Sequence, residues 1–497
     1  MVPLALALML VATAPPARRA PAPVLAAPAY LVALRDDAAI RGLDLGVEAR
    51  CLGTAKDPLG GRLRASHAAD RLLAPASGAK LLSTAAALHR LGPTKRWVTT
   101  VHGDVAPDTG VVAGDLVLVA AGDPDLQPEG LAQLASAIQA AGVREVRGRL
   151  VLDLSHFSGG SEPPAFDRKV TDAAYHPHVP AFAVAHGAVR VTVRPGKIVG
   201  AKVRVGATLV VPSITLDVDA TTVAGKDTDQ LTLEAREAAG KTVLVVRGTI
   251  GLKAPAQVFK KRVADPARVA SDVFVAQLKK AGLRMRDGAV RVLTDAPAKL
   301  PPELARLESK PLAELVRETN TSSNNFMAEL IFRHLGADDP ARTARGAGSD
   351  WTRAQDVATA VLVELGLAPA DVHIENGSGL FPATRVTPRG MVVLLATMAA
   401  AGPVGDALRD SLAKAGESGT LKTRLVALKG RLRAKTGTLD DAISLSGYLD
   451  APSCTLAFAV FVNGDIGEIA LKNAKPTPRA PSVVAAIDRF VTALSKL

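Results

Sequence analysis

The sequence predicts an α+β fold in which two helix-containing segments bracket a long β-rich insertion. An apolar repeat with helical spacing follows Ser77, and helical repeats return after Pro311. Between them, residues 97–306 consist of short strand-like runs separated by Gly, Pro and Asp turns. We therefore expect residues 29–96 and 307–497 to form one domain, interrupted by an inserted module large enough for two subdomains.

The first half of the chain predicts a hairpin, a helix and a series of strands. Residues 43–72 alternate between apolar and polar side chains around a Gly60-Gly61 turn. A helix of four turns then begins at Ser77 and stops at Gly92-Pro93. The insertion contains strand-like runs at residues 115–120, 146–152, 189–193, 203–211 and 242–248.

After the insertion, helices precede a closing meander of strands. Leu312, Leu315 and Val316 share one helical face, and two further helices are expected over residues 326–334 and 351–365. The chain closes with strands expected at residues 432–438, 442–449 and 455–462, and with an amphipathic helix over about 482–497.

Composition excludes several classes of protein. The chain has 497 residues, of which 48% are hydrophobic and 22% charged, which is typical of globular proteins. Aromatic residues make up only 3%, so recognition of nucleic acid by base stacking is not expected. The net charge is +12, but no block of five or six like charges occurs. We predict a solvated basic surface and no nucleic-acid partner, with peripheral contact to a membrane or wall polymer left open.

The first 28 residues predict a signal peptide followed by a Pro-rich spacer. A short apolar run after Met1 ends in the small-x-small pattern Ala12-Thr13-Ala14. The longest later apolar stretch is residues 391–401, whereas a spanning helix needs roughly 20 residues. We therefore expect secretion across the inner membrane to the periplasm or cell envelope, with no transmembrane segment after the signal is removed.

Ser77 and Lys80 have the spacing of a serine nucleophile and its base. Residues i and i+3 lie on the same helical face, so the amine can reach the hydroxyl. A lysine that acts as a base near neutrality needs its pKa lowered by roughly 3 units from about 10.4, on the order of 4 kcal/mol, which burial and a second cation supply. The spacing alone is weak evidence, because it recurs at Ser411 and Lys414. The alternative is that Ser77 only caps the helix.

Two more short motifs follow in the second half of the chain. Ser323 and Asn325 precede a helix, and the overlapping pair Ser322 and Asn324 leaves the register ambiguous. The tripeptide Lys435-Thr436-Gly437 opens the first closing strand, where the glycine would let a ligand backbone approach the strand edge. Taken singly, these motifs are also compatible with an ordinary helix cap and an ordinary strand start.

The order of the three motifs decides between these alternatives. Ser-x-x-Lys at a helix start, Ser-x-Asn before a helix and Lys-Thr-Gly entering a strand form the signature of penicillin-binding proteins and class A β-lactamases. Ser323 lies 246 residues after Ser77, a far longer interval than in a class A β-lactamase. The chain therefore resembles the class C low-molecular-mass penicillin-binding proteins, the D-alanyl-D-alanine carboxypeptidase/endopeptidase family often called penicillin-binding protein 4.

The resemblance covers nearly all of the chain beyond about residue 43. It implies a penicillin-recognising DD-peptidase fold, in which helices flank a five-stranded antiparallel sheet and the β-rich insertion separates the first two motifs. It also fixes the register, because the family's functional serine stands two residues before the Asn that leads into an Ala-Glu pair, which here is Ser323. Other segments that carry the resemblance are residues 118–126, 146–150 with Asp153 and Phe157, 262–266, 328–329, 377–380, 386–388 and 415–421.

The resemblance implies a role for each motif residue. Ser77 would attack the penultimate D-Ala carbonyl of a peptidoglycan stem peptide, Lys80 would take its proton, and Ser323 would relay a proton to the leaving D-Ala. The same geometry would trap β-lactams as inhibitory acyl-enzymes, without a metal or another cofactor. Substrate binding would involve Asn325 at the stem peptide and the lysine, Lys435, Thr436 and Gly437 at the terminal carboxylate and strand edge, and the backbone N–H groups of Ser77 and Thr438 at the oxyanion.

Two positions depart from the family's pattern. Asn376 stands where the family usually has Asp, and Ala185-His186-Gly187 stands where it usually has Asn residues. The first departure is expected to alter loop packing near the site, and the second to affect only the inserted module.

No catalytic or metal-binding role is expected for the two cysteines or for the one close histidine pair. If the sheet resembles the family's, the strands that carry Cys51 and Cys454 are neighbours, and a disulfide is the alternative to the free thiols that we expect. His176 and His178 are expected to be solvated loop residues and not metal ligands.

Other functions compete with the peptidase hypothesis. A Ser-His-Asp hydrolase would need a context such as Gly-x-Ser-x-Gly, which the chain lacks. A secreted esterase or β-lactamase would share the scaffold and the motifs, and comparing a D-Ala-D-Ala peptide with a simple ester as substrate separates them from a peptidase. A non-catalytic wall-binding protein would keep the motifs only as relics, and their intact residues argue against it.

Overall fold

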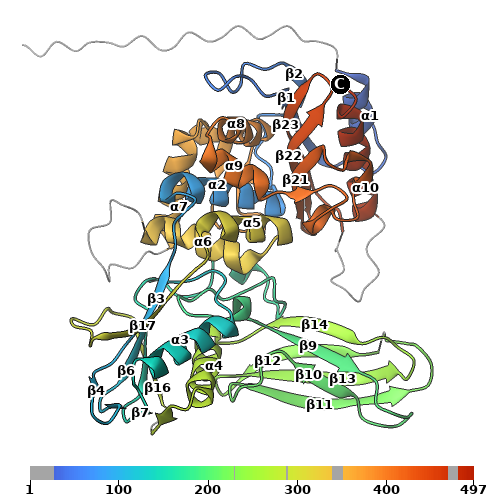
Figure 1. Cartoon of the computed structure of the whole chain (residues 1–497). Coiled ribbons are helices and arrows are strands. Elements are labelled where there is room, and N and C mark those ends of the chain that lie inside the picture. The colour runs from blue at the N-terminus through green and yellow to red at the C-terminus, as the bar shows by residue number, and fades with distance from the viewer. Residues whose placement is uncertain (1–26, 229, 287–288, 339–350, 468–478) are drawn as a thin grey trace, which may run out of the picture.

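A computed structural model describes residues 27–228, 230–286, 289–338, 351–467 and 479–497. Nearly all of the predicted signal peptide and spacer therefore lies outside the described residues. The molecule is elongated, with a sheet and its helices at one end and the inserted module at the other (Figure 1).

One antiparallel sheet organises the upper end of the molecule in Figure 1. Its order is β2 (Leu63–His67), β1 (Asp44–Cys51), β23 (Cys454–Asn463), β22 (Ala442–Ala451), β21 (Leu432–Thr438) and β20 (Ala413–Lys414). The predicted hairpin and the three predicted closing strands are all present, and the two-residue β20 adds a sixth strand to the expected five. The first and last segments of the described chain thus meet in one sheet.

Both faces of this sheet are buried, which explains why its central strands are almost wholly apolar. In β23, Phe458 and Val460 pack on one side, towards α1 (Ala29–Arg35) and α10 (Arg479–Leu494). Ala457 and Ala459 face the opposite side, where α8 (Pro388–Ala399) lies close to the strand because these side chains are small.

The helical layer is built around α2 (Ala79–Leu91), whose residues 79–88 are all buried. It contacts α5 (Leu312–Ser322), α6 (Asn325–Ala337), α7 (Trp351–Glu364) and α9 (Pro403–Asp410). The regular helix begins two residues later than predicted. Ala76 has φ +47°, so a 3₁₀ turn over Ala76–Gly78 carries Ser77 immediately before the helix.

The inserted module contains two groups of sheets. The outer group has a five-stranded sheet of β16 (Val290–Leu293), β8 (Leu150–Asp153), β6 (Leu116–Val119), β3 (Val98–His102) and β17 (Glu303–Glu308), with helices α3 (Pro128–Ala140) and α4 (Pro266–Lys280). A smaller sheet joins β15 (Arg284–Met285), β7 (Glu145–Val146), β5 (Val111–Val112) and β4 (Val105–Ala106).

The inner group lies within the sequence of the outer one, between α3 and α4. Its first sheet has the order β10 (Arg204–Ala207), β9 (Ala188–Arg194) and β14 (Gln257–Arg262). Its second sheet has the order β11 (Ile214–Val223), β13 (Lys241–Gly251) and β12 (Thr232–Ala238). Figure 1 shows these strands extending from the module, below the helices α5 and α6.

Two expectations about single residues are wrong. Cys51 and Cys454 form a disulfide, because the antiparallel register of β1 and β23 brings their Cα atoms within 5.7 Å. His176 is not solvated but buried, with its ring bonded to the Phe166 carbonyl and to the Arg262 guanidinium. Both outcomes depend on long-range contacts.

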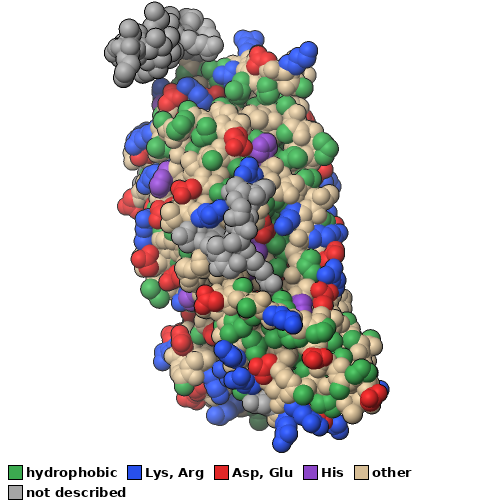
Figure 2. Space-filling view, turned by 90° about the vertical axis from the view of Figure 1, so that its left-hand side faces the viewer, with side chains coloured by type: hydrophobic (Ala, Val, Ile, Leu, Met, Phe, Trp, Pro, Cys, Tyr) green, Lys and Arg blue, Asp and Glu red, His purple; other side chains and the backbone are tan. Residues whose placement is uncertain are grey.

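The surface mixes charges of both signs. On the face shown in Figure 2, Lys and Arg side chains are interspersed with Asp and Glu side chains, as the scattered sequence positions suggest. Among the described residues, no helix combines the length and the apolar character that crossing a membrane requires.

Candidate active site

Ser77 and Lys80 meet at the start of α2. The Lys80 ammonium donates to Ser77 Oγ across 3.0 Å, and Ser77 remains partly exposed while Lys80 is fully buried. The side chain of Ser77 does not cap the 3₁₀ turn or the helix. The serine hydroxyl is therefore not used as a helix cap and lies within reach of one amine.

Burial changes the acidity of Lys80. The low-polarity surroundings disfavour the charged ammonium and lower its pKa from 10.5 to about 7, although the nearby Glu329 carboxylate acts in the opposite direction. The amine also donates to Asn325 Oδ1 at 2.7 Å and to the Ser378 carbonyl at 3.0 Å. Lys80 can thus hold or release a proton near neutrality while its position stays fixed.

Glu329 is a positioning residue whose role the sequence analysis missed. It lies on the buried face of α6, and its carboxylate accepts the backbone N–H groups of Gly377 at 3.0 Å and Ser378 at 2.8 Å. This anchors the loop whose Ser378 carbonyl contacts Lys80. Burial raises the pKa of Glu329. A glutamate within an apolar helical repeat is the sequence signal that could have revealed it.

The α5–α6 junction presents Ser323 to the site. Ser323 has φ +59°, which turns the chain between the two helices, and its hydroxyl accepts a hydrogen bond of 2.9 Å from Lys435 Nζ. Ser322 instead donates to the Glu318 carbonyl, and Asn324 caps α6 by accepting from the Met327 N–H. Ser323 and not Ser322 therefore lies against Lys435.

Asn325, at the first position of α6, connects the helical layer to the inserted module. Its Oδ1 accepts from Lys80, and its Nδ2 donates to the Tyr175 carbonyl at 2.6 Å. Because one end of the amide accepts and the other donates, its orientation is defined by both neighbours.

The strand β21 forms the opposite wall of the site. Lys435 is fully buried, and this burial, together with the nearby Lys80, lowers its pKa well below the usual value. Its amine also donates to the Thr436 carbonyl. The Thr436 hydroxyl contacts that of Thr420 at 2.8 Å, and Thr438 is exposed at the end of the strand.

Close packing is a second reason for glycine at position 437, in addition to the predicted approach of a ligand to the strand edge. A Cβ at this position would lie 2.3 Å from both the Pro75 carbonyl oxygen and Ser444 Oγ. Glycine is required because the turn that carries Ser77 packs directly across β21.

Comparison with known proteins assigns the chain to a family. The family model for the D-Ala-D-Ala carboxypeptidase 3 (S13) family matches residues 44–480. The chain belongs to this family. It is therefore a serine-type peptidase of the D-Ala-D-Ala carboxypeptidase class, as the order of its motifs predicts.

Individual relatives cover most of the chain. A D-alanyl-D-alanine carboxypeptidase of an Actinomadura strain is 30% identical over 449 residues, which is 88% of this chain and 80% of the relative. Penicillin-binding protein 4 (dacB) of Haemophilus influenzae has a TM-score of 0.78 at 21% identity and covers 94% of this chain and 99% of its own. The same protein complexed with a novel β-lactam gives a TM-score of 0.72 at 22% identity, covering 92% and 97%. These structures confirm the α+β fold with its large β-rich insertion.

The second Ser-x-x-Lys of this S13 peptidase is not a second site. The helix α9 ends at Asp410, so Ser411 and Lys414 do not share a helical face, and Lys414 lies in β20. Ser411 is buried and donates to the Leu408 carbonyl. Its role is to hold the end of α9.

Asn376, the first departure from the family pattern, fits its surroundings. Its amide nitrogen donates to the carbonyls of Leu380 at 3.0 Å and Pro164 at 3.2 Å, and its oxygen accepts from the Gly379 N–H at 2.8 Å. This closes the loop that carries Ser378 against Lys80. A carboxylate could not make the two donated bonds.

Two groups of side chains among the described residues have a metal-like arrangement, and neither of these two lies at Ser77. Asp125, His186 and Glu318 converge, but the Lys310 ammonium already bonds to both carboxylates. The other group is His156, His334 and Asp338, at the far end of α6.

Proposed function

We propose that Ser77 is the acylated nucleophile and Lys80 its general base, acting on the D-Ala-D-Ala ends of peptidoglycan stem peptides. The observation that carries the proposal is the fully buried Lys80 amine, which lies 3.0 Å from the Ser77 hydroxyl and has a pKa of about 7. The Ser77 hydroxyl caps no helix. An amine with that pKa is half neutral at neutral pH, which is the condition for a working base. Family membership supports the substrate class.

The reaction proceeds in two steps. Ser77 Oγ attacks the carbonyl carbon of the penultimate D-Ala and gives its proton to Lys80, while the backbone N–H groups of Ser77 and Thr438 stabilise the oxyanion. The amide C–N bond then breaks, and the leaving D-Ala amine receives a proton from Lys80 through Ser323. Water hydrolyses the resulting ester and regenerates Ser77.

Substrate binding uses the residues around the nucleophile. Asn325 holds the stem peptide and orients Lys80, and Lys435 and Thr436 face the terminal carboxylate of the leaving D-Ala. Gly437 keeps the strand edge open and close to Ser77. The lysine pair suits this task because an arriving carboxylate supplies the negative charge that favours protonation of Lys435.

The same geometry makes the protein a target of β-lactams, whose strained amide acylates Ser77. A β-lactam complex of the relative from Haemophilus influenzae supports this part of the proposal. We also infer a periplasmic or envelope location, supported by the Cys51–Cys454 disulfide, since such bonds persist in oxidising compartments.

The decisive assay is release of D-Ala from a diacetyl-L-Lys-D-Ala-D-Ala peptide. The wild-type protein should release D-Ala, whereas Ser77→Ala and a substrate that ends in L-Ala should give none. A simple thioester or a β-lactam as substrate tests the esterase and β-lactamase alternatives. Fast ester or β-lactam hydrolysis without D-Ala release would reject the peptidase assignment.

A further inference from the structure

Two histidines and an aspartate meet where the far end of α6 contacts the inserted module. His334 lies in the last turn of α6 and Asp338 at its C-cap, so their side chains share one side of the helix. His156 lies in the turn that follows β8 of the module. His334 is fully buried, and the other two residues are partly buried. Three groups that can bind a metal ion thus converge from segments far apart in the sequence.

The separations between these groups suit a tetrahedral metal ion. His156 Nε2 lies 3.2 Å from His334 Nδ1. The Asp338 carboxylate approaches both rings, with Oδ2 at 3.3 Å from His334 Nδ1 and Oδ1 at 3.7 Å from His156 Nε2. Zn²⁺ binds imidazole nitrogen and carboxylate oxygen at about 2.0–2.2 Å, so neighbouring ligand atoms of a tetrahedral site lie about 3.3–3.5 Å apart. Two imidazoles and one carboxylate, with a fourth position for water, are a ligand set that zinc takes in proteins.

The surroundings of the cluster orient its ligands. His334 Nε2 lies 2.8 Å from the Gly122 carbonyl oxygen, which can only accept a hydrogen bond, so Nε2 carries the proton. In the neutral ring, the Nδ1 lone pair is then on the side of His156 and Asp338. The Trp97 indole N–H donates to Asp338 Oδ2, and its ring stacks on that of His334 with 4.1 Å between the centroids. Metal-binding histidines usually donate their second ring N–H to a carbonyl or carboxylate in this way.

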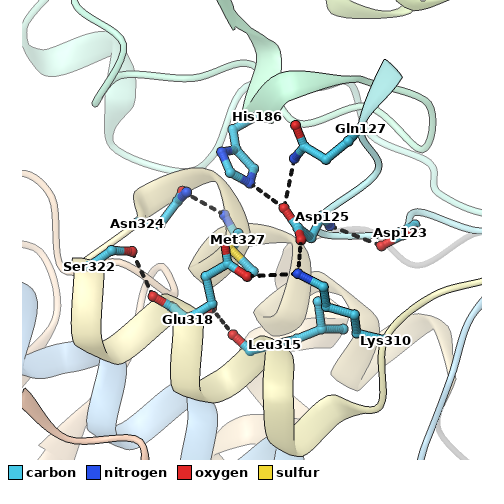
Figure 3. A network of polar contacts seen from close by, with 11 residues as sticks. Asp123, Asp125, Gln127, His186, Lys310, Leu315, Glu318, Ser322, Asn324 and Met327 are labelled. Atoms are coloured by element: carbon cyan, nitrogen blue, oxygen red, sulfur yellow. Dashed lines mark hydrogen bonds and ion pairs between the residues drawn. The ribbon is translucent and has the colours of Figure 1, made fainter. Parts of the chain in front are cut away.

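The other metal-like group already contains a cation of the protein itself. Lys310 reaches between Asp125 and Glu318 and bonds to them at 2.6 and 3.2 Å (Figure 3). His186 bonds to Asp125 at 2.9 Å from the side of the module. The negative charge of these carboxylates is balanced by the Lys310 ammonium, so this group needs no metal ion.

One ammonium also lies beside the His334 cluster. Lys95 Nζ is 3.5 Å from Asp338 Oδ2, the oxygen to which Trp97 donates. The carboxylate oxygen near His156 is Oδ1, a different atom. The side chain of Lys95 is 33% exposed, and ion pairs near the surface contribute little, so Lys95 can turn into the solvent at small cost. Lys95 therefore does not take the place that Lys310 takes in the other group.

We propose that His156, His334 and Asp338 bind one divalent transition-metal ion, with Zn²⁺ as the best match, and that this ion fastens α6 to the inserted module. The ion joins the turn after β8 to the end of the helix that begins at Asn325. It lies outside the catalytic site, because His334 is nine residues after Asn325, about 14 Å along a helix. Its role is to stabilise the contact between α6 and the module, and it takes no part in the acylation of Ser77.

The first test measures zinc binding to the whole protein after dialysis against a chelator and then against buffer. We expect one Zn²⁺ per chain by isothermal titration calorimetry, and Co²⁺ in its place should give the visible absorption of a tetrahedral complex. His156→Gln and Asp338→Asn should each weaken zinc binding by more than about 100-fold, because loss of an outer partner alone costs about 10–100-fold. His186→Gln, in the other metal-like group, is the matched control and should bind zinc as the wild type does.

A second readout connects the ion to the fold. Zn²⁺ at about 100 times its dissociation constant should raise the melting temperature of the wild type by a few degrees, because the ion binds the folded state. The same addition should leave the melting temperature of His156→Gln unchanged, although this variant keeps the circular dichroism and the penicillin acylation of the wild type. Folded wild type that binds no stoichiometric zinc would overturn the inference. Zinc binding that is unchanged in His156→Gln and Asp338→Asn, or lost in His186→Gln, would overturn it equally.

Discussion

The acidity of Lys80 sets the pH at which Ser77 can be acylated. Burial lowers the pKa of this lysine from 10.5 to about 7. Keeping this amine neutral costs the folded protein on the order of 5 kcal/mol of stability at neutral pH, relative to a lysine in water. Because the neutral amine is the base, the acylation rate should rise with pH, reaching about one tenth of its maximum at pH 6, half at pH 7 and nine tenths at pH 8.

The assay is stopped-flow acylation by a fluorescent penicillin between pH 5 and pH 9 at constant ionic strength. The second-order rate constant is fitted at each pH, circular dichroism confirms that the protein stays folded, and Ser77→Ala provides the blank. A rate that rises tenfold per pH unit through pH 9 would indicate a lysine of ordinary acidity and refute the reasoning. A rate independent of pH would refute it equally.

Glu329 provides a directional test of the same electrostatics. Its buried carboxylate favours the charged form of Lys80 and so raises the pKa of that amine. Glu329→Gln should therefore move the midpoint of the pH profile to lower pH. A midpoint displaced to higher pH would show that burial and this carboxylate do not control the base.

Three further variants, one of them a double variant, test the packing in the protein, each by urea denaturation. Lys80→Met should abolish acylation yet raise the free energy of unfolding at pH 7 by roughly 1–3 kcal/mol, because no amine is then desolvated. Cys51→Ser with Cys454→Ser should lower the free energy of unfolding by about 2–5 kcal/mol, since the disulfide joins residues 403 apart in sequence. A reducing agent should reproduce this loss in the wild-type protein. Asn376→Asp should lower the free energy of unfolding by about 1–3 kcal/mol at neutral pH, because a carboxylate would face two carbonyl oxygens. This loss should shrink at low pH, where the introduced carboxylate becomes protonated.

The sequence predicts the parts of this fold that depend on local periodicity. The apolar repeat after Ser77, the closing strands at 432–438, 442–449 and 455–462, and the turn-rich insertion all carry signals within a few residues. The order of three short motifs then identifies the family, which no single motif does. These features need no knowledge of long-range contacts.

What the sequence does not predict depends on contacts between distant segments. The Cys51–Cys454 disulfide requires the first and last segments to pair in one sheet, and the burial of His176 requires the inserted module to fold around it. Glu329 appears in sequence only as part of an Ala-Glu pair, although its carboxylate anchors a loop 48 residues away.

The central claim is that Ser77 is the residue that becomes acylated. Intact-protein mass spectrometry after brief exposure to benzylpenicillin, followed by peptide mapping, tests it most directly. We predict one covalent adduct per chain, located on Ser77 in the peptide that also contains Lys80, and no adduct in Ser77→Ala. An adduct on any other residue, or an unmodified wild-type protein that is folded and pure, would contradict the account.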